Sequence, residues 1–215
     1  LIKQCGVSSE KVKVIYNGLA EIPTNVLALS MRPINILTVA NLNPRKGYLE
    51  YLLTIEKVLQ EIPNANFTFI GRDDMNGKVQ LAIKERNLGE RVSCVGFQQD
   101  VASWMRVARL LVVPSLWGEG CPTSVLEAMS HGVPVVGYEL DGLPELIRHE
   151  QDGLLVPVGN TNDLAIAIIK LLKEREVANK MSSSSLARIK KEFKLYNCVS
   201  EHQDAFKVLL KDDKD

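Results

Sequence analysis

The sequence lacks several features that would assign it to a functional class directly. Its 215 residues carry 26 basic and 26 acidic side chains, and this balance argues against a nucleic-acid-binding protein, which needs a basic surface to displace phosphate counterions. No apolar run approaches the roughly 20 residues that cross a bilayer. Neither G-x-G-x-x-G nor G-x-x-x-x-G-K-[ST] occurs, which argues against NAD binding and P-loop hydrolysis.

Metal-ligand and disulfide patterns are also absent from the sequence. The cysteines lie far apart and form no C-x-x-C pair, at Cys5, Cys94, Cys121 and Cys198. The three histidines show no ligand spacing. We therefore expect no metal, no disulfide framework and a cytoplasmic protein with reduced thiols.

What is present is the composition of a soluble globular domain. Apolar residues make up 46% and charged residues 24%, close to the globular average, and the chain is long enough to bury a large core. It opens with Leu1 rather than methionine, and residues 1–9 do not resemble a signal peptide. We expect a piece of a longer polypeptide.

Short apolar runs alternate with amphipathic segments along most of the chain. The expected strands are 34–40, 67–71, 92–95, 110–114, 133–137 and 154–156. The expected helices between them are 47–62, 78–87, 101–107, 123–131 and 143–147. Continuous apolar strands separated by helices are typical of a parallel sheet covered on both faces. The predicted fold class is α/β, with a doubly wound, Rossmann-like sheet of about six strands.

The two ends of the chain fall outside this alternation. Residues 12–16 look strand-like and lead into a loose linker that ends at Pro33, while 164–173 and 176–211 are expected to be helices appended to the sheet. Between Lys170 and Lys194 there are eight basic and three acidic residues. Such a stretch either contacts an anionic membrane surface or is a solvated face, and the sequence leaves both interpretations open.

Three loops that follow expected strands carry unusual residues, and ligands bind at this edge of a parallel sheet. In the first loop, Lys46 stands where a helix opens. A cation there works against the helix dipole, so it suits a bound phosphate or is an ordinary surface lysine. The third loop, 141–147, has a glycine turn before a short helix and by itself predicts only a helix-capping loop.

The second loop offers an anion pocket without a P-loop. Pro122 is placed as the first helical residue, which leaves the amides of Thr123 and Ser124 free. Glu127 follows on the same helix face and leans toward the helix start. A half-buried carboxylate there would need donors, such as the two hydroxyls of a ribose. An exposed helix glutamate and an ordinary acidic loop residue are the simpler interpretations of Glu127 and Glu119.

From Ile34 to about Leu172 the chain resembles the carboxyl-terminal, donor-binding domain of the group 1 glycosyltransferases, a retaining family with the GT-B fold. Glu119 and Glu127 reproduce its E-x7-E signature. Other runs similar to the family's occur in the same order, at 15–18, 46–47, 95–97, 114–115, 128–136, 141–147 and 152–157. The resemblance implies three regions: residues 1–33 as the end of a preceding lobe and the interdomain linker, 34–175 as the nucleotide-sugar-binding domain, and 176–215 as a helical extension.

The resemblance also implies roles for individual residues. Glu127 would hold the ribose, and Lys46 with the Thr123 and Ser124 amides would hold the diphosphate. The sugar would meet Glu119 and the backbone of three residues: Gly120, Cys121 and Pro122. The base would meet Phe97 and Gln98. Asn41 stands where the family has an arginine, and its neutral amide cannot supply that charge; Arg45 is the candidate substitute.

The implied activity is sugar transfer with retention, from a UDP- or GDP-linked donor to a glycan or lipid-linked acceptor. Glu119 and Lys46 are the candidate catalytic residues, and no metal or other cofactor is expected, because Lys46 and the helix start would stabilise the leaving diphosphate. The acceptor site would belong to an amino-terminal lobe, so the chain alone should bind donor and hardly turn over. It would work in the cytoplasm or at the inner face of the membrane. Two alternatives stay open: a non-catalytic nucleotide-sugar-binding module and a GT-B-shaped epimerase.

Overall fold

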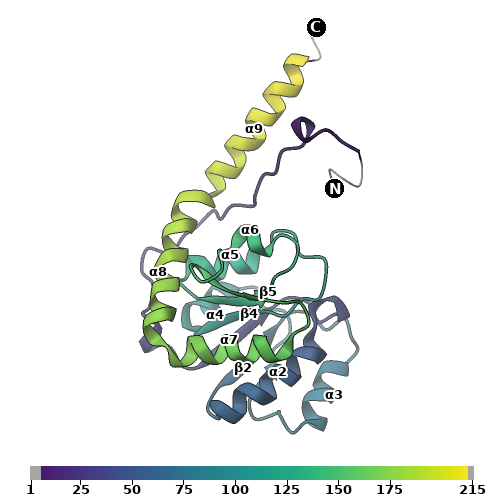
Figure 1. Cartoon of the computed structure of the whole chain (residues 1–215), viewed down its shortest axis with the longest axis vertical. Helices are drawn as coiled ribbons and strands as arrows, with labels where there is room; N and C mark the ends of the chain where they lie inside the picture. The colour runs from purple at the N-terminus through teal and green to yellow at the C-terminus, as the bar shows by residue number, and fades with distance from the viewer. Residues whose placement is uncertain (1–5, 213–215) are drawn as a thin grey trace.

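The computed structural model describes residues 6–212, which form one parallel sheet and the helices around it (Figure 1). The six strands lie in the order β3-β2-β1-β4-β5-β6. Their bounds are β1 Asn35–Val39, β2 Asn66–Ile70, β3 Val92–Cys94, β4 Leu110–Val113, β5 Val135–Tyr138 and β6 Gly153–Val156. The α/β class and all six expected strands are confirmed, with bounds that shift by at most two residues.

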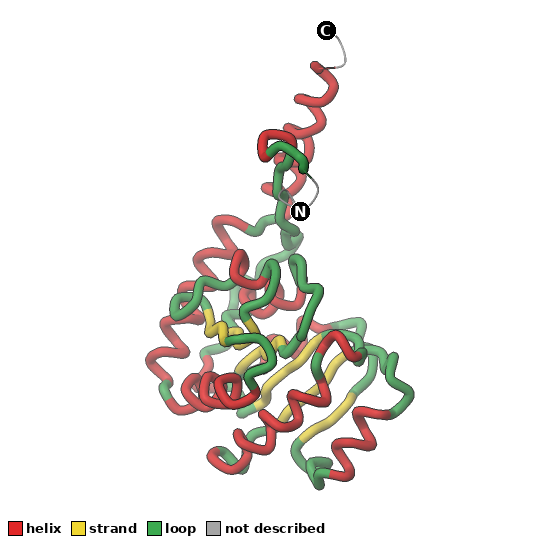
Figure 2. Tube along the Cα trace, turned by 45° about the vertical axis from the view of Figure 1, so that its right-hand side comes forward, coloured by secondary structure: helices red, strands yellow, loops and turns green. Residues whose placement is uncertain are grey.

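Helices connect the strands and flank the sheet (Figures 1 and 2). They are α2 Tyr48–Glu61, α3 Lys78–Glu85, α4 Val101–Val107, α5 Thr123–Ser130, α6 Leu143–Leu146, α7 Thr161–Lys173, α8 Arg175–Glu192 and α9 Leu195–Asp212. Three short 3-10 turns complete the set: η1 Ser9–Lys11, η2 Leu29–Met31 and η3 Pro44–Lys46. None of the helices in this part of the chain is long and apolar enough to cross a membrane.

Alternate strand residues enter two hydrophobic cores, one on each face of the sheet. In β4, Leu110 and Val112 join the core under α2, α3 and α7, whereas Leu111 and Val113 join the core under α4, α5 and α6. Side chains of a strand point alternately to opposite faces, so an uninterrupted apolar run fills both cores. This is the doubly wound arrangement that the sequence predicts.

Helix α7 is part of the core rather than an appendage. Its residues Leu164, Ile168 and Leu171 are buried in the same core as α2. The helix also begins earlier than expected, because the Asn160 side chain accepts hydrogen bonds from the amides of Asn162 and Asp163 at 3.1 and 3.0 Å. Asparagine is among the preferred N-cap residues. The apolar stripe alone does not reveal this first turn.

The expected helical stretch 176–211 is two helices, α8 and α9, broken at Phe193 and Lys194. Phe193 is 2% exposed, and its carbonyl accepts a hydrogen bond from the Leu19 amide at 2.8 Å. The Leu195 amide in turn donates to the Leu19 carbonyl at 2.9 Å. The amino-terminal linker therefore supplies backbone partners at the break.

The amino-terminal segment runs beside α9, which extends away from the sheet (Figures 1 and 2). The strand expected at residues 12–16 does not form: these residues pair with no strand in the described part of the chain, and Val14 is 61% exposed. Residues 94, 121 and 198 are free cysteines. Cys5 lies outside the described residues.

Arg32 fastens the linker to the domain. Its guanidinium is 2% exposed and donates to the carbonyls of Leu27, Ala108 and His131 at 3.0, 2.9 and 2.7 Å. Ala108 and His131 are the C-caps of α4 and α5. A cation is favourable at a helix C-terminus, so this one residue fixes the far ends of the two helices that flank the predicted site.

Candidate functional site

The three loops singled out from the sequence meet at the carboxyl edge of the sheet. The strand order reverses between β1 and β4, and such a switch point opens a crevice for ligands. The Leu116 amide, after β4, donates to the Arg45 carbonyl, after β1, at 2.8 Å. The Gly142 amide, after β5, donates to the Glu119 carbonyl at 3.0 Å. Backbone hydrogen bonds thus join the loops into one structure.

Lys46 and Glu119 form a buried ion pair. The Lys46 ammonium donates to Glu119 Oε1, which also accepts from the Ser115 hydroxyl. The two side chains are 13% and 4% exposed. Coulomb attraction is strong where water is excluded, so each charge has its partner before any ligand arrives. The sequence assigned both residues to a ligand and did not predict this pair.

Lys46 ends the turn η3 instead of opening α2. Gly47 separates the two elements in the left-handed region, with φ at 64°. A Cβ on Gly47 would lie 2.2 Å from the Pro114 carbonyl oxygen, so only glycine lets the two loops approach this closely. Arg45, also in η3, contacts the loop after β4. Its guanidinium donates to the Gly118 carbonyl and lies 4.0 Å from Glu119 Oε1. Both cations therefore lie at Glu119.

The start of α5 presents unpaired amides. Pro122 is the N-cap and has extended backbone angles. The sequence predicted it as the first helical residue, but α5 begins one residue later, at Thr123. Among residues 6–212 no acceptor is found for the amides of Thr123 and Ser124. A small hollow at this point is lined by residues from β1, β4 and the α5 start, including Lys46, Glu119, Pro122 and Ser124. The structure therefore brings Lys46 and Ser124 to one hollow, whereas Thr123, also predicted for the diphosphate, is not among the residues that line it.

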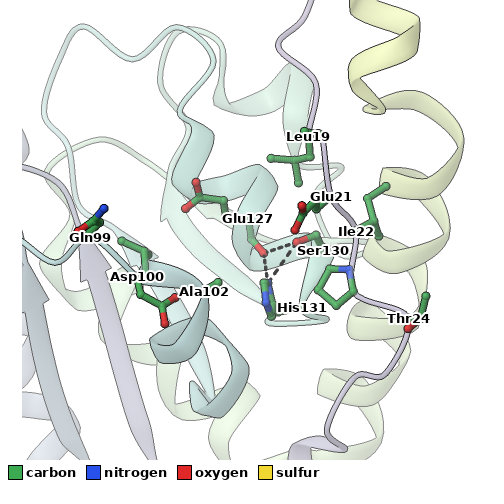
Figure 3. A pocket seen from close by; sticks show the side chains of 13 residues that line it. Leu19, Glu21, Ile22, Thr24, Gln99, Asp100, Ala102, Glu127, Ser130 and His131 are labelled. Atoms are coloured by element: carbon green, nitrogen blue, oxygen red, sulfur yellow. Dashed lines mark hydrogen bonds between the residues drawn. The ribbon is translucent and has the colours of Figure 1, made fainter.

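Glu127 lines a different and larger cavity, of about 800 Å³. Figure 3 shows its carboxylate on the side of Gln99 and Asp100, away from Ser130 and His131. It is half-buried, burial raises its pKa, and its carboxylate has no partner in the described residues. Glu119 and Glu127 therefore do not share one cavity: Glu119 precedes α5 and turns back to Lys46, whereas Glu127 lies further along the helix and lines the large cavity.

Ser130 and His131 fix the backbone beneath Glu127. The Ser130 hydroxyl donates to the Glu127 carbonyl at 2.7 Å, and His131 Nδ1 lies 2.9 Å from the same oxygen (Figure 3). A nitrogen at that distance from a carbonyl must carry the proton. These bonds hold the end of α5 while the Glu127 carboxylate remains available.

The remaining predicted contacts lie around these two hollows. Asn41 Oδ1 accepts from the Arg72 amide at 3.2 Å, so Asn41 ties the first loop to the one after β2. Phe97 is 69% exposed, and Gln98 donates to the Val95 carbonyl at 2.9 Å. Neither residue lines the large cavity, where Gln99 and Asp100 lie in their place.

Two further predicted residues pack against their neighbours. A Cβ on Gly142 would lie 2.0 Å from the Gly120 carbonyl oxygen, so the second and third loops touch there. The half-buried Cys121 has a raised pKa because of burial, and its carbonyl accepts from the Asn17 side chain at 3.1 Å.

Three residues of the site had no role in the sequence prediction. Ser115 donates to Glu119, Asp141 accepts from the Gly118 and Glu119 amides, and Asn17 contacts Cys121. Each lies in a run that matches the family pattern. The partners of Asp141 and Asn17 are distant in sequence, so the pattern alone gave no signal for those contacts, whereas Ser115 lies only four residues from Glu119.

A family model described as glycosyl transferases group 1 matches residues 24–188. The chain belongs to the group 1 glycosyl transferases. The match begins within the linker and ends within α8, so it covers the whole sheet and the loops at its carboxyl edge.

Curated relatives of this group 1 glycosyl transferase are about twice its length. The amylovoran biosynthesis glycosyltransferase AmsK of Erwinia amylovora is 29% identical over 197 residues, covering 87% of this chain and 48% of the relative. The Escherichia coli UDP-Gal:alpha-D-GlcNAc-diphosphoundecaprenol alpha-1,3-galactosyltransferase is 24% identical, covering 95% of this chain and 56% of the relative. The chain thus spans about half the length of these relatives.

Solved structures confirm the fold as that of GT-B glycosyltransferases. Anabaena HepE, solved in complex with UDP and glucose, superposes with a TM-score of 0.82 at 22% identity, covering 95% of this chain and 59% of HepE. Sucrose-phosphate synthase from Thermosynechococcus elongatus superposes with a TM-score of 0.75 at 27% identity, covering 85% of this chain and 46% of the synthase.

Proposed function

We propose that this glycosyl transferase chain is the donor-binding domain of a retaining enzyme that moves a sugar from a nucleotide-sugar to a glycan or lipid-linked acceptor. The observation that carries the proposal is the hollow at the start of α5, where Ser124, whose amide has no acceptor in the described residues, lies beside the Lys46–Glu119 pair. A helix start with free amides and adjacent cations favours a phosphate group.

The hollow at the α5 start measures only about 10 Å³, so the donor would lie over its mouth and extend into the large cavity. The diphosphate would lie at the amides of Thr123 and Ser124, with the sugar toward Glu119 and the nucleoside in the large cavity at Glu127. Glu127 lacks donors in the described residues, and a ribose diol supplies two. A ligand that spans both hollows explains why the two acidic residues do not share one.

Lys46, Arg45 and the α5 dipole would stabilise the negative charge that grows on the leaving diphosphate. This positive charge takes the role that a divalent cation has in other phosphate sites, so we propose transfer without an essential metal. Arg45 would stand in for the charge that Asn41 cannot supply. The reaction as proposed breaks the bond between sugar and diphosphate and forms a bond from the sugar to an acceptor hydroxyl.

The acceptor would bind to an additional amino-terminal lobe, so the chain by itself should bind donor and hardly turn over. The name of the E. coli relative gives alpha-D-GlcNAc-diphosphoundecaprenol, a lipid-linked sugar, as its acceptor. The name of AmsK assigns that relative to amylovoran biosynthesis. Acceptors of these classes fit a cytoplasmic enzyme at the inner face of the membrane, where the exposed Lys180, Lys190 and Lys191 of α8 would meet anionic lipid.

Titration calorimetry with UDP- and GDP-sugars tests the donor site. Wild type should bind a nucleotide-sugar, and Glu127→Ala should weaken that binding at least about tenfold, because hydrogen bonds to a charged group are lost. The matched control is Glu85→Ala, an exposed glutamate on α3, whose affinity should equal that of wild type. Equal affinities for all three proteins would contradict the site.

Activity with the amino-terminal lobe restored separates the alternatives. Sugar transfer that continues in the presence of a chelator supports the proposal, whereas donor binding without transfer supports a non-catalytic module. Interconversion of UDP-N-acetylglucosamine with its epimer would favour the epimerase.

The raised pKa of Glu127 predicts the pH dependence of binding. As the pH falls, the carboxylate gains a proton and can no longer accept from both hydroxyls, so the dissociation constant of the nucleotide-sugar should rise on acidification, starting above the ordinary glutamate pKa of 4.5. In Glu127→Gln, binding should be weaker but flat over the same pH range. Calorimetry at several pH values checks this, and an identical pH profile in both proteins would exclude Glu127 as the titrating group.

A further inference from the structure

Asp141 holds the peptide of Glu119 from the neighbouring loop. Its Oδ2 accepts hydrogen bonds from the amides of Gly118 and Glu119 at 2.9 and 3.0 Å. Successive backbone amides around a left-handed residue form a concave site for an anion, and Gly118 has φ at 72°. In this structure the anion is the side chain of Asp141.

Gly142, the residue after Asp141, binds the backbone carbonyl of Glu119. The Gly142 amide donates to the Glu119 carbonyl at 3.0 Å. A Cβ on Gly142 would lie 2.0 Å from the Gly120 carbonyl oxygen, so no larger residue fits without moving that loop. Asp141 and Gly142 together therefore bind both the N–H and the C=O of Glu119.

The backbone at Asp141 is itself unfavourable. Its φ is 46°, in the left-handed region that non-glycine residues rarely adopt, although aspartate and asparagine tolerate it better than most. Such a conformation costs free energy and persists where the surrounding contacts determine it, typically at functional sites. At Asp141 these contacts are the two hydrogen bonds from the Gly118 and Glu119 amides, which belong to the loop of the candidate site and not to the hydrophobic core.

We propose that Asp141 is a positioning residue for the donor sugar: it fixes the Gly118–Glu119 turn, and so holds the Glu119 carboxylate on Lys46 and the Gly120–Pro122 backbone in place for the ligand. This inference rests on the proposed function in so far as a sugar is the ligand. The anchoring of the turn itself is a property of the ligand-free protein.

Two variants separate the carboxylate from the backbone requirement. Asp141→Asn keeps a side-chain oxygen that can accept from both amides, and asparagine tolerates the left-handed conformation. Asp141→Gly keeps that conformation without cost but removes the acceptor. The matched control is Asp73→Gly, because Asp73 also accepts from two backbone amides, those of Met75 and Gly77 at 2.8 and 2.7 Å, in the loop after β2.

The first measurement is hydrogen–deuterium exchange of the ligand-free protein. Exchange at the Gly118 and Glu119 amides should be about tenfold faster in Asp141→Gly than in wild type, because each amide loses a charged acceptor. Asp141→Asn should retain most of the protection, and Asp73→Gly should match wild type at these two amides. Unchanged protection in Asp141→Gly would overturn the proposed anchoring.

The second measurement compares the affinity for a UDP-sugar with that for UDP. Asp141→Gly should weaken the UDP-sugar about tenfold and UDP by much less, because the amides of α5 and Glu127 remain intact, and Asp141→Asn should restore the ratio. A similar loss for both ligands would show a general structural role and overturn the assignment to the sugar. If wild type binds only a GDP-sugar, the same comparison is made with that sugar and GDP. If wild type binds neither a UDP-sugar nor a GDP-sugar, the proposed function and this assignment both fail, whereas the exchange data still decide the anchoring.

Discussion

Replacing Lys46 by methionine should lower the free energy of unfolding by about 3–5 kcal/mol, the usual effect of removing one partner from a buried ion pair. The Glu119 carboxylate is 4% exposed and would keep the Ser115 hydroxyl as its side-chain hydrogen-bond donor, with the Arg45 guanidinium 4.0 Å away as its remaining cation. For a chain of this length the melting midpoint should fall by roughly 10 °C. Urea denaturation followed by circular dichroism gives the free energy, and a thermal scan gives the midpoint.

The control for Lys46→Met is Lys173→Met, which breaks an ion pair at the surface. Lys173 lies 2.6 Å from Glu61, and the two side chains are 52% and 55% exposed. Exposed pairs of this kind contribute less than about 1 kcal/mol. If both variants lose the same small amount, water reaches the Lys46–Glu119 pair and the buried interaction described above is wrong.

The second large effect is expected at Asp152, which anchors α8. This carboxylate is fully buried and accepts from Arg148 Nε, Arg148 Nη2 and the Ser184 hydroxyl at 2.7, 2.8 and 2.8 Å. It also lies 3.3 Å from the Arg188 guanidinium. Asp152→Ala removes the acceptor of three hydrogen bonds, two of them from the Arg148 guanidinium, so we expect a loss of about 3–5 kcal/mol by urea denaturation. Asp204→Ala, in the exposed pair with Lys207, should change stability by less than about 1 kcal/mol.

Asp152 should also contribute to acid denaturation. Burial by itself would raise its pKa, but the hydrogen bonds from Arg148 and Ser184 outweigh that effect and lower the pKa below the usual 3.8. A carboxyl whose folded pKa is depressed stabilises the protein above its unfolded pKa, and this contribution is lost as the pH falls through the folded value. The loss therefore sets in as the pH approaches the unfolded value of 3.8 and is complete below the folded pKa, and Asp152→Ala should lack it.

The sheet could be predicted because its strands are short, uninterrupted apolar runs in the sequence. Continuous apolar runs such as 110–113 fill both cores. They are too short for helices and lie between amphipathic helical segments, which indicates buried strands of a parallel sheet. The misassigned strand at 12–16 has the right residue types but no partner, and β-propensity reflects packing against neighbours rather than an intrinsic preference. The break between α8 and α9 was missed because its cause, Leu19, is far away in the chain.

The site was predicted as a set of residues but not as a set of interactions. The residues at the α5 start were found because proline, free amides and glycine have local consequences that sequence reveals. The Lys46–Glu119 pair joins residues 73 positions apart, and nothing in either loop indicates that they meet. The division between the Glu119 and Glu127 hollows also depends on which way each side chain turns, and that is decided by tertiary packing.

The bond from Asn17 to the Cys121 carbonyl gives the linker a mechanical connection to the ligand-binding loop. Tyr16, beside it, donates to the Glu145 carboxylate at 2.7 Å, so two consecutive linker residues grip the second and third loops. A force on the amino-terminal side of the chain is therefore transmitted through Asn17 to Cys121, the residue before Pro122. Under the proposed function, a movement of the amino-terminal lobe would therefore be transmitted through the linker to the loop that precedes α5.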